Sequence, residues 1–161
     1  MELDMEIKGL EQLEKALDEF ANEFEGAGPK EAKAVVRTAL RKAVTPAKSS
    51  IIALTPVDTG ELKDHVKISI KAPTKKQMRT GHFRDSTFLA AWVGYIWDAG
   101  DNGMFQKAVF NEYGSKNNPK HAPIERTFNS QIENIVNKFE EEAIPAITKI
   151  GNKLLKKRGI K

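Results

Sequence analysis

The sequence has no cysteine and only three histidines. The absence of cysteine excludes disulfides, thiol nucleophiles and thiolate metal sites. No run of about 18 uncharged apolar residues occurs, which argues against a membrane-spanning helix. The first residues, MELDME, alternate acidic and apolar side chains and lack the basic and apolar segments of a signal peptide. We therefore expect a soluble protein that is made in a cytoplasm.

The length and composition predict one globular unit. The chain has 161 residues, of which 40% are hydrophobic and 30% charged. This is enough for one core and short for two. We expect a single domain over residues 1–161.

Charge is unevenly distributed. Residues 1–25 contain nine acids and two lysines, a net charge of −7, so the net charge of +4 leaves +11 for residues 26–161. Cations concentrate in residues 30–48, 71–84 and 149–161. Such surfaces bind nucleic acid or acidic proteins, or are simply solvated. The sequence leaves both interpretations open.

Hydrophobic periodicity predicts an α+β fold with a small mixed or antiparallel sheet packed with two long kinked helices. Alternating patterns predict strands at 1–8, 65–73 and 87–96, and spacings of three and four predict helices at 10–25, 30–54 and 122–157. The 87–96 strand is apolar on both faces, as is typical of a central strand. Residues 105–113 fit a short helix or a strand, and residues 73–86 read as a mobile loop.

The two long helices carry further expectations. Pro46 and Pro145 should kink them. The terminal helix would be about 50 Å long if unbroken, and an element longer than a small domain is wide usually packs against another chain. The earlier helix carries a basic ridge of candidate DNA-facing residues, Lys33, Arg37, Arg41 and Lys48.

The tripeptide Asp58-Thr59-Gly60 is the one that carries the catalytic carboxylate of aspartic proteases. In those enzymes it lies in a loop of an all-β fold, whereas here it follows a long helix that Pro56 should end. Asp58 stands three residues before Glu61, which fits an N-cap before a short helical turn. We interpret the tripeptide as a structural corner.

The chain offers little for a metal or a cofactor. His65, His82 and His121 are scattered, without the spacing of a zinc site, and no phosphate-binding glycine motif occurs. We expect neither a metal nor a cofactor. Trp92, Tyr95 and Trp97 could stack nucleic-acid bases beside the basic segment 73–84, although such residues are more often core.

Two stretches resemble one family. The first is ALTPVDTGELK at 53–63, at the end of a long helix and before a strand; the second is VFNEYGS at 109–115, followed by APIER at 122–126. Together they are similar to the phage tail-component family typified by gene product ten of the HK-ninety-seven-type phages. The likeness extends from residue 1 to about 145, with departures at Ser115, Ile124 and Thr127.

The resemblance implies a structural virion protein without enzymatic activity. It would join head to tail at the neck of a long-tailed phage, as a homo-oligomeric ring around the DNA channel. Its partners would be other copies, the neighbouring head-completion and tail-terminator proteins and, non-specifically, packaged DNA, with no membrane involved. It would be located in the neck or tail of the virion, and in the host cytoplasm during assembly.

The matched residues have structural roles in this interpretation. Pro56 ends the helix, Asp58 and Thr59 cap the next turn, Gly60 permits close packing and Leu62 anchors the turn in the core. Glu112, Gly114, Pro123 and Arg126 set the start of the terminal helix, with an ion pair between Glu112 and Arg126.

Two other functions remain open from the sequence: sequence-independent DNA binding, on the charge of residues 26–161, and hydrolysis, on Asp-Thr-Gly alone. The charge pattern also allows either the acidic segment 10–25 or the basic ridge to line a channel. Ring stoichiometry, the order of neighbouring rings and the host are not encoded in any recognisable pattern.

Overall fold

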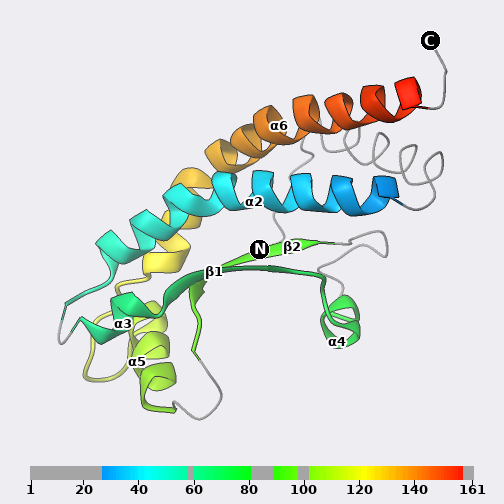
Figure 1. The fold of residues 1–161 in the computed structure, drawn as a ribbon. Helices are drawn as coiled ribbons and strands as arrows, with labels where there is room; N and C mark the ends of the chain where they lie inside the picture. Colours follow the sequence, from blue (N-terminus) through cyan, green and yellow to red (C-terminus); the bar gives the residue numbers. More distant parts are fainter. Residues whose placement is uncertain (1–26, 58–59, 81–88, 98–101, 158–161) are drawn as a thin grey trace. The chain divides into compact units, whose positions relative to one another are not determined.

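The computed structural model describes residues 27–57, 60–80, 89–97 and 102–157 (Figure 1). The helices are α2 (Ala27–Leu54), α3 (Glu61–Asp64), α4 (Lys75–Met78), α5 (Asn102–Tyr113) and α6 (Pro123–Lys157), and the strands are β1 (Val66–Lys71) and β2 (Ala90–Tyr95). The strand expected at 1–8 and the helix expected at 10–25 lie outside the described residues.

The chain divides into two compact units, residues 1–42 with 136–161 and residues 43–135. Helices α2 and α6 each contribute to both units and each contain an internal proline, Pro46 and Pro145. The predicted single domain over 1–161 stays a prediction.

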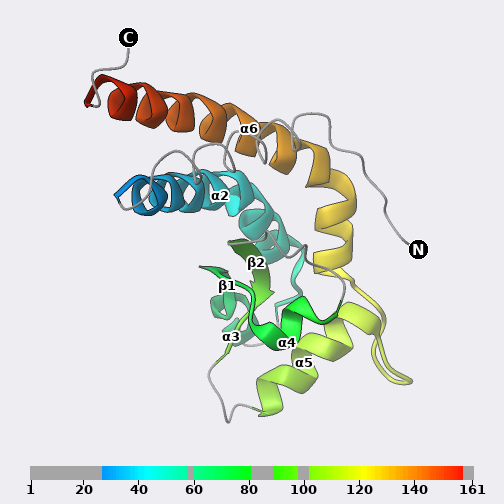
Figure 2. The ribbon, with the colours of Figure 1, turned by 90° about the vertical axis from the view of Figure 1, so that its right-hand side faces the viewer.

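In the first unit, the beginning of α2 and the end of α6 lie side by side (Figure 2). The buried side chains include alanines on both helices: Ala32 and Ala39, with Val36, on α2, and Ala143, with the larger Ile147, on α6. Small side chains allow helix axes to approach closely. An exposed ion pair between Lys42 Nζ and Glu142 Oε2, at 2.7 Å, also links the two helices.

In the second unit, the end of α2 supplies the core. Ala43, Ala47 and Ile51 follow one another at intervals of four residues and are completely buried, as one face of an amphipathic helix should be. The Ser50 hydroxyl accepts a hydrogen bond from the Gln131 side chain. This contact connects α2 to the beginning of α6 within the unit.

The sheet has two described strands, β1 and β2, which pair antiparallel with Val66 opposite Tyr95 and Lys71 opposite Ala90. Val66 and Ile70 are buried, whereas Lys67 and Lys71 are exposed, so one face of β1 is wet as its alternation predicts. The α+β class with an antiparallel sheet is confirmed. Among the described residues β2 pairs with β1 alone, and its predicted central position stays a prediction.

The interpretation of residues 73–86 as a loop is wrong for residues 75–78, which form α4. Thr74 Oγ1 accepts the Gln77 N–H at 3.3 Å, and Gln77 Oε1 accepts the Thr74 N–H at 2.9 Å. This capping box stabilises a helical turn without hydrophobic periodicity, which is why the periodicity did not reveal it. Residues 105–113 belong to α5, so the helical alternative is the correct one.

Candidate interaction surface

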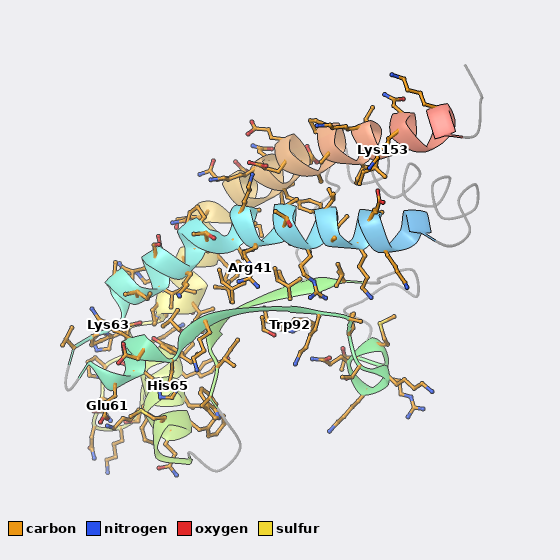
Figure 3. The ribbon with its side chains drawn as sticks, in the orientation of Figure 1. Arg41, Glu61, Lys63, His65, Trp92 and Lys153 are labelled. Atoms are coloured by element: carbon orange, nitrogen blue, oxygen red, sulfur yellow. The ribbon has the colours of Figure 1, made fainter. Side chains whose placement is uncertain are left out.

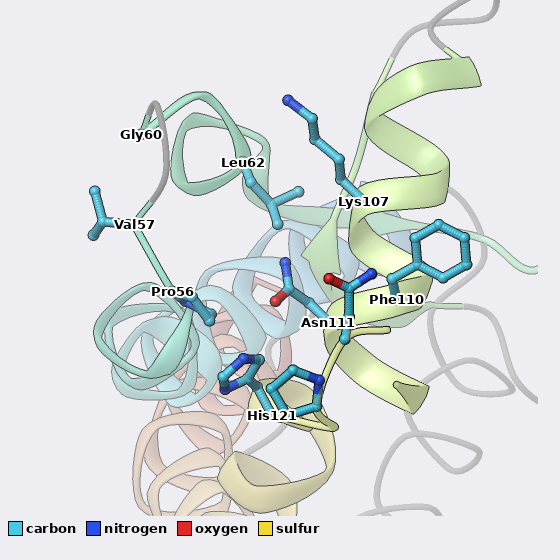
Figure 4. A pocket seen from close by; sticks show the side chains of 10 residues that line it. Pro56, Val57, Gly60, Leu62, Lys107, Phe110, Asn111 and His121 are labelled. Carbon is cyan, nitrogen blue, oxygen red and sulfur yellow. The ribbon is translucent and has the colours of Figure 1, made fainter. Parts of the chain in front are cut away.

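The two motif stretches meet at one surface pocket of about 250 Å³ in the unit of residues 43–135 (Figure 4). The first stretch contributes Pro56, Val57, Gly60 and Leu62; α5 and the loop after it contribute Lys107, Phe110, Asn111, Asn118, Pro119 and His121. Segments about 50 residues apart in sequence therefore form one site. The contacts that hold each segment in place account for the residue types found there.

The end of α2 is fixed by Thr55. Its backbone N–H donates to the Ile51 carbonyl at 2.9 Å. Its hydroxyl donates to the same carbonyl at 2.6 Å and is 2.7 Å from the Tyr95 hydroxyl. The helix ends at Leu54, two residues before Pro56, since proline disfavours the helical conformation of the residue before it.

Tyr95 joins β2 to the end of α2 through this hydrogen bond. Burial raises the pKa of Tyr95 above its ordinary value of 10.0, the hydrogen bond with Thr55 opposes that shift, and the negative charge of Glu112 adds to it. Tyr95 is thus coupled both to the first motif stretch and to the carboxylate of the second.

Gly60 has a different role from the expected close packing. A Cβ at Gly60 would have nothing within 4 Å, and its φ is +86°. Glycine is favoured there because it adopts left-handed backbone at little cost. Gly60 is also the N-cap residue of α3, without a side-chain cap. The prediction that Asp58 is the N-cap is therefore wrong by two positions, while Asp58 and Thr59 themselves lie outside the described residues.

Leu62 is the buried residue of α3, with 8% of its surface exposed. In the first stretch, then, a left-handed glycine turns the chain and a leucine enters the core. Neither feature requires a polar side-chain contact to a distant part of the sequence.

Glu112 caps the start of α6, and its predicted ion pair with Arg126 is wrong. Glu112 Oε2 accepts the Ile124 N–H at 3.0 Å and Oε1 accepts the Glu125 N–H at 2.8 Å. Arg126 is exposed to solvent. The first N–H groups of a helix lack partners within it and favour a negative charge, so the carboxylate binds them instead of the guanidinium.

The loop between α5 and α6 folds back onto α5. The Asn111 carbonyl accepts the N–H groups of His121 and Ala122, both at 3.0 Å. Ala122 has a φ of +47°, and buried Pro123 begins α6. Proline suits this position because its missing N–H would have had no partner.

Gly114 makes the turn after α5, with a φ of +78°. Its N–H donates to the Phe110 carbonyl at 2.8 Å. A Cβ at Gly114 would lie 3.1 Å from the Lys120 backbone nitrogen. Glycine is therefore favoured both by the backbone conformation and by the close approach of Lys120.

Around the pocket, large apolar side chains face solvent. Val57 and Phe110, which line it, are 69% and 42% exposed. Elsewhere on α5, Tyr113 is 73% exposed, and Phe105, at 49%, packs edge-on against Trp97 with ring centroids 5.4 Å apart. Surface ion pairs join Lys107 to Glu61 at 3.8 Å and Lys120 to Glu125 at 2.5 Å, and the pairing raises the pKa of Lys120. Exposed apolar residues bordered by charges are typical of protein-binding surfaces.

The predicted DNA-facing ridge is divided between the two units. Lys33, Arg37 and Arg41 are exposed on α2 in one unit, whereas Lys48 is half-buried and belongs to the other. The three aromatic residues do not form one stacking platform. Tyr95 bonds Thr55, Trp97 packs on Phe105, and the Lys71 ammonium lies 5.5 Å from the centre of the Trp92 ring.

Within the described part of the chain, no group of three or more histidines and acids could hold a metal ion. His82 lies outside that part. The described helices also include none with the length and apolar character needed to cross a membrane.

Comparison with known protein families gave a match over residues 10–86. Neither a curated protein nor a solved structure matches the chain. The matched range, residues 10–86, includes the first motif stretch. The second stretch, at 109–126, lies outside it. Over residues 10–86, the chain carries the sequence pattern of the family described as "Bacteriophage HK97-gp10, putative tail-component".

Proposed function

We propose that this chain is a structural subunit at the neck of a long-tailed phage, where it assembles into a homo-oligomeric ring around the DNA channel and contacts the head-completion and tail-terminator proteins. The family match supports a tail-component role. The observation that carries the assembly role is the exposed apolar surface at the pocket where the two motif stretches meet.

The chemistry of this surface suits assembly rather than catalysis. Glu112 and Thr55 are engaged in holding backbone and side chains in place. Val57 and Phe110 at the pocket and Tyr113, later on α5, are exposed apolar groups, and their burial against a neighbouring subunit would be favourable. Aromatic anchors next to a pocket are a common arrangement in protein interfaces. The protein would act without enzymatic activity, as the family's description as a tail component suggests.

Electron microscopy of phage lysates that lack this gene product tests the location. Filled heads beside separate tails of normal length would support a role at the joint. Intact infectious particles would contradict it, and tails of abnormal length or no tails would place the protein elsewhere in tail assembly.

Light scattering coupled to gel filtration tests the surface. The double variant Phe110→Ser/Tyr113→Ser should shift the protein to smaller assemblies with unchanged circular dichroism. Ile144→Ser is the matched control, because Ile144 is also an exposed large apolar residue, at 40%, but lies in the other unit. The proposal would be contradicted if the double variant and the control lose assembly equally. It would also be contradicted if neither variant loses assembly.

The alternative function, hydrolysis, rests on Asp-Thr-Gly and can be tested directly. Asp58→Asn should leave particle assembly and infectivity unchanged if residues 58–60 serve only as a corner. Loss of infectivity with a folded, normally assembled protein would favour a catalytic carboxylate.

A further inference from the structure

The wet face of the sheet and helix α4, which follows β1 after three residues, carry a second group of side chains, distinct from the pocket, which we call the basic sheet surface. Its members are Lys67 and Lys71 on β1, Trp92 on β2, Lys75 and Lys76 on α4, and Arg79 at the end of α4. Trp92 shares the face of Lys67 and Lys71 because it pairs directly with Ser69, and opposite residues of an antiparallel pair project to the same side. Figure 3 shows Trp92 on the side of the sheet toward which α4 lies.

The charge of this surface is of one sign. Residues 65–80 contain five cations and no acid. All five cations are exposed. In the part of the chain that the structure describes, none of them lies within ion-pair distance of a carboxylate, in contrast to Lys42, Lys107 and Lys120, which each have a glutamate partner.

The surface also lacks the apolar anchors of a protein interface. The large apolar residues exposed in the described chain are Val57, Phe105, Phe110, Tyr113 and Ile144, and none of these belongs to β1, α4 or β2. The partner that fits is therefore a polyanion recognised by charge alone, because protein partners usually bury aromatic or aliphatic anchors at the centre of the contact.

Trp92 indicates which part of a nucleic acid would be bound. The Lys71 ammonium lies over the Trp92 ring, 5.5 Å from its centroid, so this ring face is engaged by a cation and not available to stack on a base. The contact also restrains Lys71, which lowers the entropy that the side chain would lose on binding an anion.

We propose that the basic sheet surface, rather than the ridge on α2, binds the phosphate backbone of duplex DNA without sequence preference. Phosphate contacts supply sequence-independent affinity through release of counterions. The five cations set the size of the effect, since each phosphate neutralised contributes about −0.9 to the slope of log K against log salt, or about −4.5 in all. This inference does not depend on the location of the protein at the neck.

The test measures fluorescence anisotropy of a labelled 30-base-pair duplex with the full chain between low and moderate salt. The triple variant Lys71→Gln/Lys75→Gln/Lys76→Gln should reduce the magnitude of the slope by about 3. The matched control Lys30→Gln/Lys33→Gln/Arg37→Gln removes the same net charge from exposed positions on α2 and should leave the slope close to that of the unmodified protein. Circular dichroism checks that both variants fold.

Three outcomes would overturn the proposal. Equal loss in the triple variant and its control would show that net charge alone drives binding. No binding of the unmodified protein at low salt would exclude DNA as a partner. Displacement of the duplex by polyglutamate at equal charge concentration would indicate an acidic protein segment as the partner instead.

Discussion

The two motif stretches that line the pocket are held in place by different kinds of contact. In the first, Gly60 turns the chain in open space and Leu62 enters the core. In the second, Glu112 bonds two backbone N–H groups of another helix, and Gly114 lies against the backbone of Lys120. At Gly60 and Leu62 the first stretch depends on local backbone conformation and burial, and its hydrogen bond to a distant segment is made earlier, by Thr55 to Tyr95. At Glu112 and Gly114 the second stretch depends on polar and steric fit between segments.

This difference predicts unequal sensitivity to substitution. Placing a residue other than glycine in left-handed backbone costs about 1–2 kcal/mol. Removing a buried carboxylate that accepts hydrogen bonds from the first N–H groups of a helix costs more, because those N–H groups are left without partners. The second stretch should therefore be the less tolerant of the two, although both border the same pocket.

Glu112→Ala, together with Gly114→Ala, should have the largest effect on stability. Loss of the two hydrogen bonds from Ile124 and Glu125 should lower the free energy of unfolding by about 2–3 kcal/mol, measured by urea denaturation. Glu125→Ala is the control, since Glu125 is exposed and pairs with Lys120 at the surface; it should cost less than about 1 kcal/mol. If the control costs as much as Glu112→Ala, the cap is not the main contact at this helix start.

Substitution of the glycines compares the two stretches directly. Gly114→Ala should lower the free energy of unfolding by about 2–3 kcal/mol, because left-handed backbone costs about 1–2 kcal/mol and the added Cβ must displace the Lys120 backbone. Gly60→Ala should show only the backbone cost, because Gly60 also has a positive φ but no atom lies within 4 Å of the added Cβ. The difference between the two in urea denaturation measures the steric part. Equal losses would show that the close approach at Gly114 relaxes freely.

Tyr95→Phe tests the hydrogen bond that ties β2 to the first stretch. Removal of the phenolic hydroxyl should lower the free energy of unfolding by about 1 kcal/mol, measured by urea denaturation at neutral pH. Thr55→Val should cost about the same, and the double variant should cost less than the two single losses added together. Fully additive losses would mean that the two hydroxyls do not act as a pair.

The pH dependence of stability follows from the raised pKa of Tyr95. The unfolded chain loses this proton at about pH 10, before the folded one does. The contribution of the protonated tyrosine is therefore fully present below pH 10 and is lost as pH rises through the higher folded value. The free energy of unfolding should fall more steeply above pH 10 in the unmodified protein than in Tyr95→Phe. Identical pH profiles would show that Tyr95 titrates normally.

The sequence predicted those parts of the fold that depend on local patterns. Apolar residues at spacings of three and four predicted a helix at 30–54, which the structure shows as α2. The alternation from Val66 to Lys71 predicted β1 and its wet face. Helix α4 was missed although its signal, Thr74 followed by Gln77 three residues later, is present in the sequence. A search for capping boxes in addition to periodicity would have found it.

For the candidate site, the sequence identified both stretches but not how their residues act. It named Glu112, Gly60 and Gly114 as important, yet paired Glu112 with Arg126 and assigned close packing to Gly60. The exposed aromatic side chains Phe110 and Tyr113 were part of the second stretch without a stated role. Their importance follows from exposure next to a pocket, which no spacing in the sequence reveals.

The sequence by itself determined the two long helices, the strands β1 and β2, where α2 ends, and which residues carry the charge, because each of these depends on neighbours a few positions away. Only the tertiary structure decided that Glu112 binds the start of α6, that Gly114 needs space while Gly60 needs only a left-handed turn, and that the two stretches share one pocket. These outcomes depend on the distance between atoms that are remote in sequence, and that distance is set by the packing of the core.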